Sequence, residues 1–283
     1  MRDVRYFAPT EISEATKLLA ESGEKATILA GGTDLVPKIN CYELRPDVLL
    51  YIGGLDLNYI REEDGKLVIG ATTPTGKLAE SDLLAKKASA LVEAARHSGC
   101  FSTRTTATVG GNLANGSPAA DLAPPLMVMD AECHLVNAKG KRVVAVKEFF
   151  TGPGETVLRA DELLTEIHVP IPKGKTDFLK LGRRKTMTLS VANVGVHLVL
   201  NGRKCTVASI ALGSMAPTPL RCVKAEELIT GKELDEALIG ECATQAVAES
   251  EPIDDQRASA WYRKKAGRAL VARALARAAG LES

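Results

Sequence analysis

The sequence has few aromatic residues and lacks any long apolar run. Aromatic residues make up 4% of the 283-residue chain, and there is a single tryptophan. No uninterrupted apolar stretch approaches the roughly 20 residues that a membrane-spanning helix needs. The first residues, MRDVRY, also lack the apolar core of a signal peptide. We therefore expect a cytoplasmic protein with no membrane span.

Cysteines and histidines are few and scattered. The six cysteines contain no C-x-x-C pair or other metal-ligand spacing, so six reduced, mostly buried thiols are expected. Iron–sulfur clusters are normally held by closely spaced cysteines, which places any such cluster on another chain. The histidines are also isolated from one another in sequence, which predicts structural roles and no metal site in this chain. They are His97, His134, His168 and His197.

The charge balance and the glycine patterns exclude several classes of protein. The formal net charge is +1, which gives no global electrostatic reason to bind nucleic acid or an acidic membrane. Apolar residues at 45% and charged residues at 25% are ordinary for a soluble globular protein. Neither glycine-rich segment described below fits G-x-G-x-x-G or G-x-x-x-x-G-K-[ST], so a Rossmann or P-loop fold has no support.

Two segments with adjacent glycines stand out, at residues 28–35 (ILAGGTDL) and 106–125 (TATVGGNLANGSPAADLAPP). In each, a short apolar or β-branched run is expected to end in a Gly-Gly loop. Adjacent glycines permit positive φ and leave backbone N–H groups open to a ligand, and successive N–H groups form a concave site for phosphate. Two such loops suggest one extended ligand held between two lobes. The alternative is a pair of tight turns in which Asp34 or Asp121 merely caps a helix.

The pattern along the chain predicts a small first lobe, a larger strand-rich second lobe and a third domain, with boundaries at residues 1–53, 54–174 and 175–283. The first two contain the following expected elements: helix 11–20, strands 27–30 and 48–52, strand 67–70, one amphipathic helix 83–97, helix 122–130, strands 132–136 and 142–146, a loop at 148–154 and strand 163–171. The third contains strands 178–181, 191–200 and 206–212, and helices 223–230, 235–248 and 259–279. Asn201-Gly202 predicts a hairpin turn in the third domain.

The two glycine segments, in this order and separation, closely resemble those of the FAD-binding subunit of molybdenum hydroxylases. That family includes xanthine dehydrogenase, aerobic carbon monoxide dehydrogenase and nicotinate dehydrogenase. The C-terminal third resembles bacterial xanthine dehydrogenase-type members at residues 180–190 (KLGRRKTMTLS), 216–221 (APTPLR) and 257–263 (RASAWYR). The resemblance implies an α+β fold of the vanillyl-alcohol-oxidase (PCMH) type. Two lobes would clasp a non-covalent FAD, followed by a C-terminal domain of a small antiparallel sheet with helices.

The resemblance also implies a set of cofactor-binding residues. The first segment would line one side of the FAD, with residues 30–33 donating N–H groups to the pyrophosphate and residues 108–112 supplying opposing donors. Ser117 would offer a hydroxyl, and Asp121 would accept from a ribose or adenine group. Leu164 would pack on a ring and Lys180 would lie near the ring system or phosphates; otherwise they are a routine core leucine and an exposed lysine. The full set is Ile28, Leu29, Ala30, Gly31, Gly32, Thr33, Asp34, Leu35, Thr108, Val109, Gly110, Gly111, Asn112, Ser117, Asp121, Leu164 and Lys180.

One departure from the family pattern lies just before the second glycine segment. Family members usually have Ile-Arg-Asn there, whereas this chain has Thr103, Arg104 and Thr105. The change bears on the local wall of the flavin site, and on the electron acceptor, more than on FAD binding itself.

The role implied by the resemblance is electron transfer with no catalytic residue of the chain's own, because the flavin carries the redox chemistry. A large subunit would hold the molybdenum cofactor, a small subunit would hold [2Fe-2S] clusters, and NAD⁺ is the expected acceptor. One alternative is a stand-alone flavin-dependent oxidoreductase, although no residue stands out as a substrate base or covalent flavin anchor. The other is a nucleotide-binding scaffold protein with no redox role.

Overall fold

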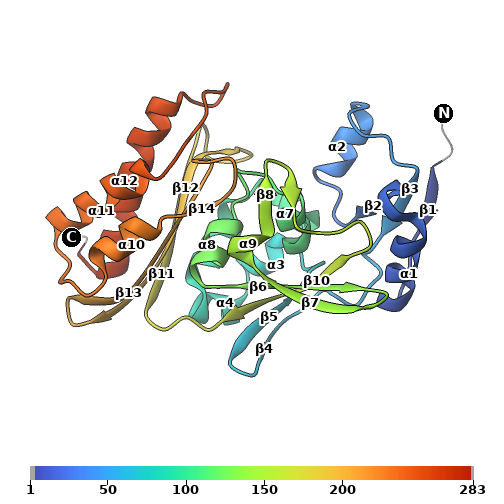
Figure 1. The fold of residues 1–283 in the computed structure, drawn as a ribbon, viewed down its shortest axis with the longest axis horizontal. Helices are drawn as coiled ribbons and strands as arrows, with labels where there is room; N and C mark the ends of the chain where they lie inside the picture. The colour runs from blue at the N-terminus through green and yellow to red at the C-terminus, as the bar shows by residue number, and fades with distance from the viewer. Residues whose placement is uncertain (1–3, 282–283) are drawn as a thin grey trace.

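The computed structural model describes residues 4–281. Residues 1–3 and 282–283, which belong to the ends of the expected first and third domains, lie outside the described part of the chain. The molecule is elongated, with the N-terminal lobe at one end and the C-terminal helices at the other (Figure 1). Within residues 4–281, no helix has both the length and the apolar character needed to cross a membrane.

The N-terminal lobe is a small parallel sheet with helices. Its strands occur in the order β1–β3–β2, and β3 pairs in parallel with both neighbours. Alternate side chains of β3, such as Leu50, enter a core shared with Ala15 and Leu19 of the first helix. The elements are β1 (Arg5–Phe7), α1 (Ile12–Ser22), the 3-10 turn η1 (Gly23–Lys25), β2 (Ala26–Leu29), α2 (Leu35–Asn40) and β3 (Val48–Tyr51).

The central lobe is built on a five-stranded antiparallel sheet, ordered β4–β5–β10–β6–β7. Its strands are β4 (Ile60–Glu63), β5 (Lys66–Gly70), β6 (Glu132–Asn137), β7 (Gly140–Ala145) and β10 (Leu163–Pro170), with a separate hairpin of β8 (Phe150–Gly152) and β9 (Glu155–Thr156). Its helices are α3 (Thr75–Ala79), α4 (Asp82–Lys87), α5 (Ser89–His97), α6 (Phe101–Thr106), α7 (Val109–Ala114), α8 (Ala123–Val128) and α9 (Val146–Phe149). All of these helices except α6 share the largest core with one face of the sheet.

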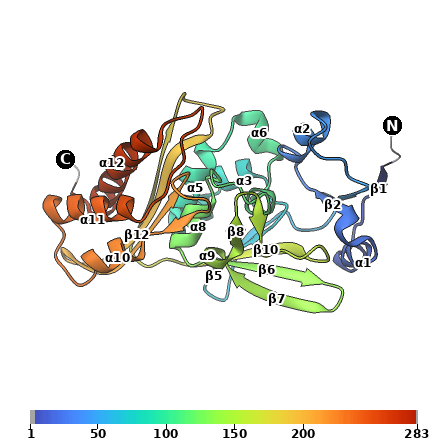
Figure 2. The same cartoon turned by 45° about the horizontal axis from the view of Figure 1, so that its top comes forward.

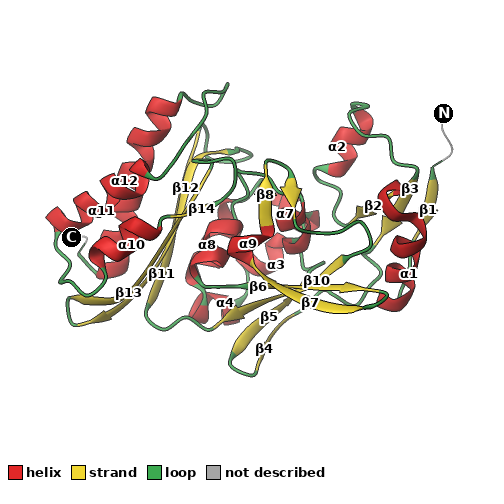
Figure 3. Ribbon diagram, in the orientation of Figure 1, coloured by secondary structure: helices red, strands yellow, loops and turns green. Residues whose placement is uncertain are grey.

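The C-terminal part is a four-stranded antiparallel sheet ordered β11–β12–β13–β14. Figure 3 shows its three helices together on one side of this sheet, with α8 of the central lobe on the other. The α8 face approaches so closely that a Cβ on Gly195 would lie 2.9 Å from the Pro124 carbonyl carbon. The elements are β11 (Lys175–Gly182), β12 (Ser190–Asn201), β13 (Lys204–Gly213), β14 (Leu220–Arg221), α10 (Val223–Ile229), α11 (Glu236–Ala248) and α12 (Ala260–Ala279).

The α+β fold class and the element types of this third part are confirmed. Strands β11 to β13 contain the three predicted segments, and the predicted hairpin turn is present, with Asn201 paired to Lys204 and Gly202 at φ +59°. A turn residue with positive φ is what the Asn-Gly signal predicts, because glycine adopts that conformation without steric cost.

The single helix predicted over residues 83–97 is wrong. The structure has two helices, because Ala88 takes a non-helical conformation (φ −147°, ψ 55°) and ends α4 as α5 begins. Ala88 is fully buried, as are Leu84 before it and Leu91 after it, and all three belong to the same core. The amphipathic periodicity is retained on both sides of the break, so the sequence pattern alone gave no sign of the change in direction.

Two further expectations differ from the structure. The β-branched run before Gly110 is not a strand: Thr106 ends α6, and Gly110 and Gly111 lie in the first turn of α7 rather than in a loop. Thr108 is the N-cap of α7, a position that threonine favours because its hydroxyl accepts from a first-turn N–H. The loop expected at 148–154 instead contains the end of α9 and strand β8, with Gly154 at φ +79° in the turn to β9.

Candidate functional site

The first glycine segment connects the end of β2 to the start of α2. Residues 28–35 comprise the last two residues of β2, a short loop and the first residue of the helix. Gly32 takes φ +70°, where L side chains are strained, and a Cβ there would lie 2.9 Å from Val36 Cγ2. Asp34 occupies the N-cap position of α2 but makes no side-chain capping bond. Asp34 is therefore the N-cap residue of α2, as the capping alternative expected, although its side chain makes no bond to the helix.

The second glycine segment is held rigidly against the end of β5. The Gly110 N–H donates to the Ala71 carbonyl at 2.9 Å, and the Val109 N–H donates to the Thr73 carbonyl at 3.0 Å. A Cβ on Gly110 would lie 2.7 Å from both the Ala71 carbonyl oxygen and its Cβ, so no larger residue fits without displacing this contact. Glycine is required here for close backbone approach and not for positive φ.

The tertiary structure brings the two segments into direct contact. A Cβ on Gly31 would lie 1.9 Å from the carbonyl oxygen of Thr106. A second link joins the flanking helices, where Lys38 Nζ of α2 donates to Asn115 Oδ1 at the end of α7 at 3.4 Å. Figure 2 shows α2 beside α6, the helix that leads into the second segment. Residues far apart in sequence therefore form one site between two lobes.

The two segments differ in their available donors. In the described part of the chain, the N–H groups of Gly31, Gly32 and Thr33 donate to no protein acceptor. The donors of the second segment are occupied, because the Gly111 N–H donates to Thr108 Oγ1 at 3.0 Å and the Asn112 N–H to the Thr108 carbonyl at 2.9 Å. Four of the five N–H groups of residues 108–112 are therefore occupied, whereas the first segment offers a row of open donors suited to an anion.

Two polar side-chain atoms near the second segment are buried without a partner. Among the described residues, Asn112 Oδ1 and Thr72 Oγ1 are inaccessible to solvent and have no hydrogen-bond partner. Thr72 lies next to Ala71, the residue against which Gly110 packs. Buried polar atoms are almost always satisfied in folded proteins, so these two indicate a missing polar ligand. Together with the open donors of the first segment, they fit a bound dinucleotide.

Asp121 and Lys180 form a buried ion pair that joins the central lobe to the C-terminal sheet. Lys180 Nζ donates to Asp121 Oδ2 at 2.6 Å and to the His97 carbonyl at 2.9 Å. The other carboxylate oxygen accepts from Ser190 Oγ at 2.7 Å and from Asn193 Nδ2 at 3.0 Å. The Lys180 side chain is only 3% exposed. The alternative interpretation of Lys180 as an exposed surface lysine is therefore wrong. Asp121 also does not cap α8, whose N-cap is residue 122.

The remaining predicted residues, Ser117 and Leu164, belong to the central lobe. Ser117 Oγ accepts from the Ala119 N–H at 3.2 Å in the loop after α7. Leu164, on β10, is buried in the central core.

Thr105 and Arg104 line a cavity of about 980 Å³ beside α3 and α6. Of the two residues that depart from the family pattern, Thr105 therefore lies on the wall of that cavity.

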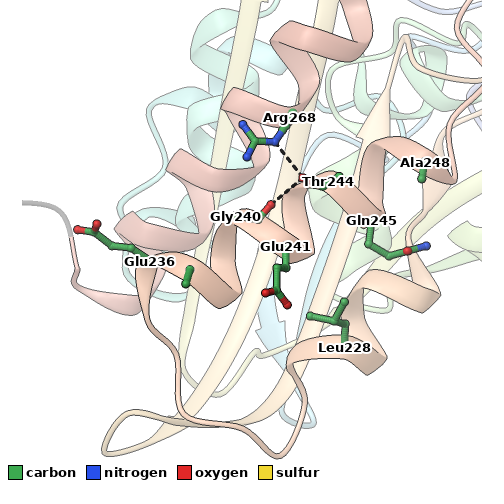
Figure 4. Close-up of a pocket in the computed structure, with 9 residues that line it drawn as sticks. Leu228, Glu236, Gly240, Glu241, Thr244, Gln245, Ala248 and Arg268 are labelled. Atoms are coloured by element: carbon green, nitrogen blue, oxygen red, sulfur yellow. Dashed lines mark hydrogen bonds between the residues drawn. The ribbon is translucent and has the colours of Figure 1, made fainter.

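A second hollow lies in the C-terminal part, away from every predicted site residue. Its volume is about 530 Å³, and Arg268 of α12 donates to Thr244 of α11 across it at 2.9 Å (Figure 4). No residue of the glycine segments lines it. The lining residues are Leu228, Glu236, Ala237, Gly240, Glu241, Thr244, Gln245, Ala248 and Arg268.

Several residues of the candidate site could not be predicted from the sequence. Thr72, Ser190 and Asn193 carry no motif of their own, and only their contacts connect them with the glycine segments and with Asp121. The one available signal was the segment 180–190, which was noted for its resemblance to the family without a role for the serine that ends it.

Comparison with known proteins identifies the family to which this site belongs. Residues 2–172 match the family model described as the FAD binding domain in molybdopterin dehydrogenase. The chain belongs to this family of FAD-binding subunits of molybdopterin-dependent dehydrogenases. Residues 177–278 match a second model, the CO dehydrogenase flavoprotein C-terminal domain. The chain is therefore a flavoprotein subunit of an oxidoreductase, and FAD is its cofactor.

Relatives align over nearly the whole chain. The carbon monoxide dehydrogenase medium chain of Afipia carboxidovorans is 34% identical over 275 residues, covering 96% of each chain. The xanthine dehydrogenase FAD-binding subunit of Escherichia coli O157:H7 is 32% identical and covers 91% of this chain and 90% of its own. Among solved structures, carbon monoxide dehydrogenase from Hydrogenophaga pseudoflava superposes with a TM-score of 0.95 at 32% identity, covering 99% of this chain and 98% of that chain.

Proposed function

We propose that this chain is the electron-transfer subunit of a multi-subunit molybdenum hydroxylase of the xanthine dehydrogenase type. It takes electrons from [2Fe-2S] clusters of a small subunit and passes them to an acceptor such as NAD⁺. The observation that carries the proposal is the contact of Gly31 with Thr106, which makes one site from two glycine segments. We assign lobes at residues 1–53 and 54–174 to FAD binding and residues 175–283 to a separate C-terminal domain.

In this proposal the two segments hold opposite parts of the cofactor. The open N–H groups of Gly31, Gly32 and Thr33 receive the pyrophosphate, because they are the unoccupied donors of the site. Asn112 binds through its side chain, since its buried Oδ1 lacks a partner, and Gly110 and Gly111 keep the backbone close. The rest of the predicted set, from residues 28–35, 108–112, Ser117, Asp121, Leu164 and Lys180, lines the same site.

When bound, FAD supplies the redox chemistry, accepting single electrons and releasing a pair as hydride. The chain's own residues then have only to bind the FAD, orient it and shield it from solvent. The buried pair of Asp121 and Lys180 fixes the position of the C-terminal sheet behind the site, because both partners are withdrawn from solvent. No acid–base dyad is assigned to the chain.

The cluster-bearing and molybdenum-bearing subunits are proposed as partners. The relatives are named as medium chains and FAD-binding subunits, which supports a hetero-oligomer. All six cysteines are free thiols, and four of them (Cys133, Cys205, Cys222 and Cys242) are buried in the cores, which fits clusters held by another chain in the reducing cytoplasm. The large subunit would carry the molybdenum cofactor and the substrate pocket.

Co-expression of the chain with its neighbouring genes tests the proposal. The purified chain alone is expected to show flavin absorption released by acid as FAD. The complex should add iron–sulfur absorption and reduce NAD⁺ when its molybdenum-site substrate is supplied. Full-rate reduction of FAD in the isolated chain by that substrate would instead favour a stand-alone oxidoreductase. A colourless chain that neither binds added FAD nor recruits partners would favour a nucleotide-binding scaffold.

A further inference from the structure

The exposed face of the central sheet carries a cluster of histidine and carboxylate side chains outside the flavin site. Strands β6 and β10 are antiparallel neighbours, and His134 lies opposite Glu166 while His168 lies opposite Glu132. Successive side chains of a strand point to opposite faces, and the intervening Cys133 and Ile167 are fully buried in the core. The histidines and glutamates therefore share the other face of the sheet.

The three central side chains converge closely. The imidazole rings of His134 and His168 stack with centroids 3.6 Å apart. His168 Nε2 lies 2.8 Å from Glu166 Oε2. One ligand atom from each of the three residues lies within 4.8 Å of the others, a spacing that a single metal ion can bridge. All three side chains are half-buried, so an ion has access from solvent while the site remains partly shielded.

One ring nitrogen of this cluster has no hydrogen-bond partner among the described residues. His134 Nε2 is buried and makes no hydrogen bond among the described residues. A buried ring nitrogen without a partner is unusual, because nearly all buried polar atoms are satisfied by protein or by a bound group. Its neighbours in the cluster are ligand types themselves, so the atom points to a cation rather than to a missing acceptor.

Neighbouring side chains hold the carboxylate in position. The Tyr59 hydroxyl donates to Glu166 Oε1, and Arg61 Nη2 lies 3.4 Å from the same oxygen. Oε1 is therefore occupied, and Oε2 remains on the side of the histidines. Lys66 pairs with Glu132 at 2.8 Å on the same face, which leaves Glu166 as the carboxylate of the cluster. Outer partners of this kind orient metal ligands and raise their affinity.

We propose that His134, His168 and Glu166 form a binding site for one divalent transition-metal ion of the zinc class. Two imidazole nitrogens and one carboxylate oxygen are a common zinc ligand set, and a water molecule would complete the tetrahedron. Ligation replaces the direct contact of His168 with Glu166 by two bonds to the ion and gives His134 Nε2 its partner. The ion links β6 to β10 on the sheet face opposite the core.

The site escaped sequence analysis because its ligands lie on different strands. His134 and His168 are far apart in the chain, and only the pairing of β6 with β10 makes them neighbours. Glu166 and His168 are separated by one residue, which puts them on the same face of β10 but matches no recognised metal spacing. The prediction that this chain holds no metal depended on sequence spacing alone.

Zinc binding to the untagged, FAD-loaded full-length chain tests the proposal. After removal of metals with a chelator, titration with Zn²⁺ should show one tight site per chain that Mg²⁺ does not occupy. His134→Gln and His168→Gln should each weaken it by at least about 100-fold. His97→Gln is the matched control, because His97 lies 3.9 Å from Glu93 as an exposed histidine–glutamate pair on α5, and it should leave the tight site unchanged.

X-ray absorption of the zinc-loaded wild-type chain provides a measurement that needs no variant. The expected first shell contains nitrogen and oxygen only, at distances of about 2.0–2.2 Å, with the scattering pattern of two imidazoles. A zinc–sulfur shell would assign the ion to the cysteines and overturn the proposal. So would the absence of a tight site in the wild type, or a tight site retained in both histidine variants.

Discussion

The backbone of Gly31 lies directly against the carbonyl of Thr106, at a distance that leaves no space for a side chain. A Cβ on Gly31 would be 1.9 Å from the Thr106 oxygen, far closer than any real contact of this kind. Gly31 belongs to the N-terminal lobe, and Thr106 is both the last residue of α6 and the first residue of the second glycine segment. The contact is therefore where the two lobes meet, at the proposed flavin site.

Substitution of Gly31 by alanine should separate the two segments and impair FAD binding. The new methyl group collides with a backbone atom, which cannot move aside as a flexible side chain would. We expect Gly31→Ala to lower FAD affinity at least about tenfold, equivalent to about 1.4 kcal/mol, as measured by fluorescence titration of the apoprotein. Gly140→Ala is the control, since a Cβ there meets nothing within 4 Å. Equal FAD affinity in both variants would contradict the assigned contact.

Removal of Lys180 should destabilise the chain by leaving Asp121 as an uncompensated buried charge. The two side chains are 3% and 7% exposed and lie 2.6 Å apart. We expect Lys180→Met to lower the free energy of unfolding by about 3–5 kcal/mol. The double variant Lys180→Met/Asp121→Asn should recover part of that loss, because it removes the unpaired charge. Urea denaturation measures both values, and a double variant less stable than Lys180→Met would contradict this explanation.

Asp255 should make the C-terminal part sensitive to acid. Burial alone would raise the pKa of Asp255, but hydrogen bonds from Arg257 and Arg263 hold that pKa well below its usual range. Arg263, which is almost completely buried, donates to Asp255 Oδ1 at 2.7 Å. A depressed pKa contributes stability above the unfolded value of about 3.9, and this contribution is lost as pH falls through the folded pKa.

We therefore expect Asp255→Asn to lower the free energy of unfolding by about 1.5–3 kcal/mol at pH 7, the range for hydrogen bonds to charged groups. The difference from the wild type should shrink when the pH is lowered below about 4, because Asp255 then takes up a proton in the unfolded chain while the folded carboxylate, with its lowered pKa, stays ionised. Urea denaturation midpoints of the wild type and of Asp255→Asn, at pH 7 and at pH 3, measure this difference in stability. A difference that stays constant or grows on acidification would show that the aspartate charge is not the source of the stability.

The elements of the C-terminal part were predictable because local signals agree with the tertiary structure. Alternating apolar residues give β12 and β13, and Asn201-Gly202 supplies the turn between them. Helix α12 has a serine N-cap that accepts from the Tyr262 N–H and ends at Gly280 in the left-handed conformation. Start and stop signals of this kind act within a few residues, so the sequence alone reveals them.

Long-range packing explains the failures. Ala88 interrupts a continuous helical pattern because Leu84 and Leu91 must both reach the same core from two directions. Glycine at position 110 was expected because it can adopt a positive φ. In the structure it is required for a different reason: without a Cβ, its backbone in the first turn of α7 can pack against Ala71. The helix break at Ala88 and the packing of Gly110 both depend on tertiary contacts, which a local sequence pattern does not encode.

The sequence by itself determined the family, the cofactor and the segments that form the site, because the motifs at residues 28–35 and 106–125 and their order are properties of the chain. Only the tertiary structure decided that Gly31 meets Thr106, that Lys180 is buried against Asp121, and that His134 faces Glu166. These pairings are set by strand register and by the packing of whole lobes, where many weak contacts act together. A motif spans a few consecutive residues and is visible in the sequence. Which distant side chains become neighbours depends on the complete fold.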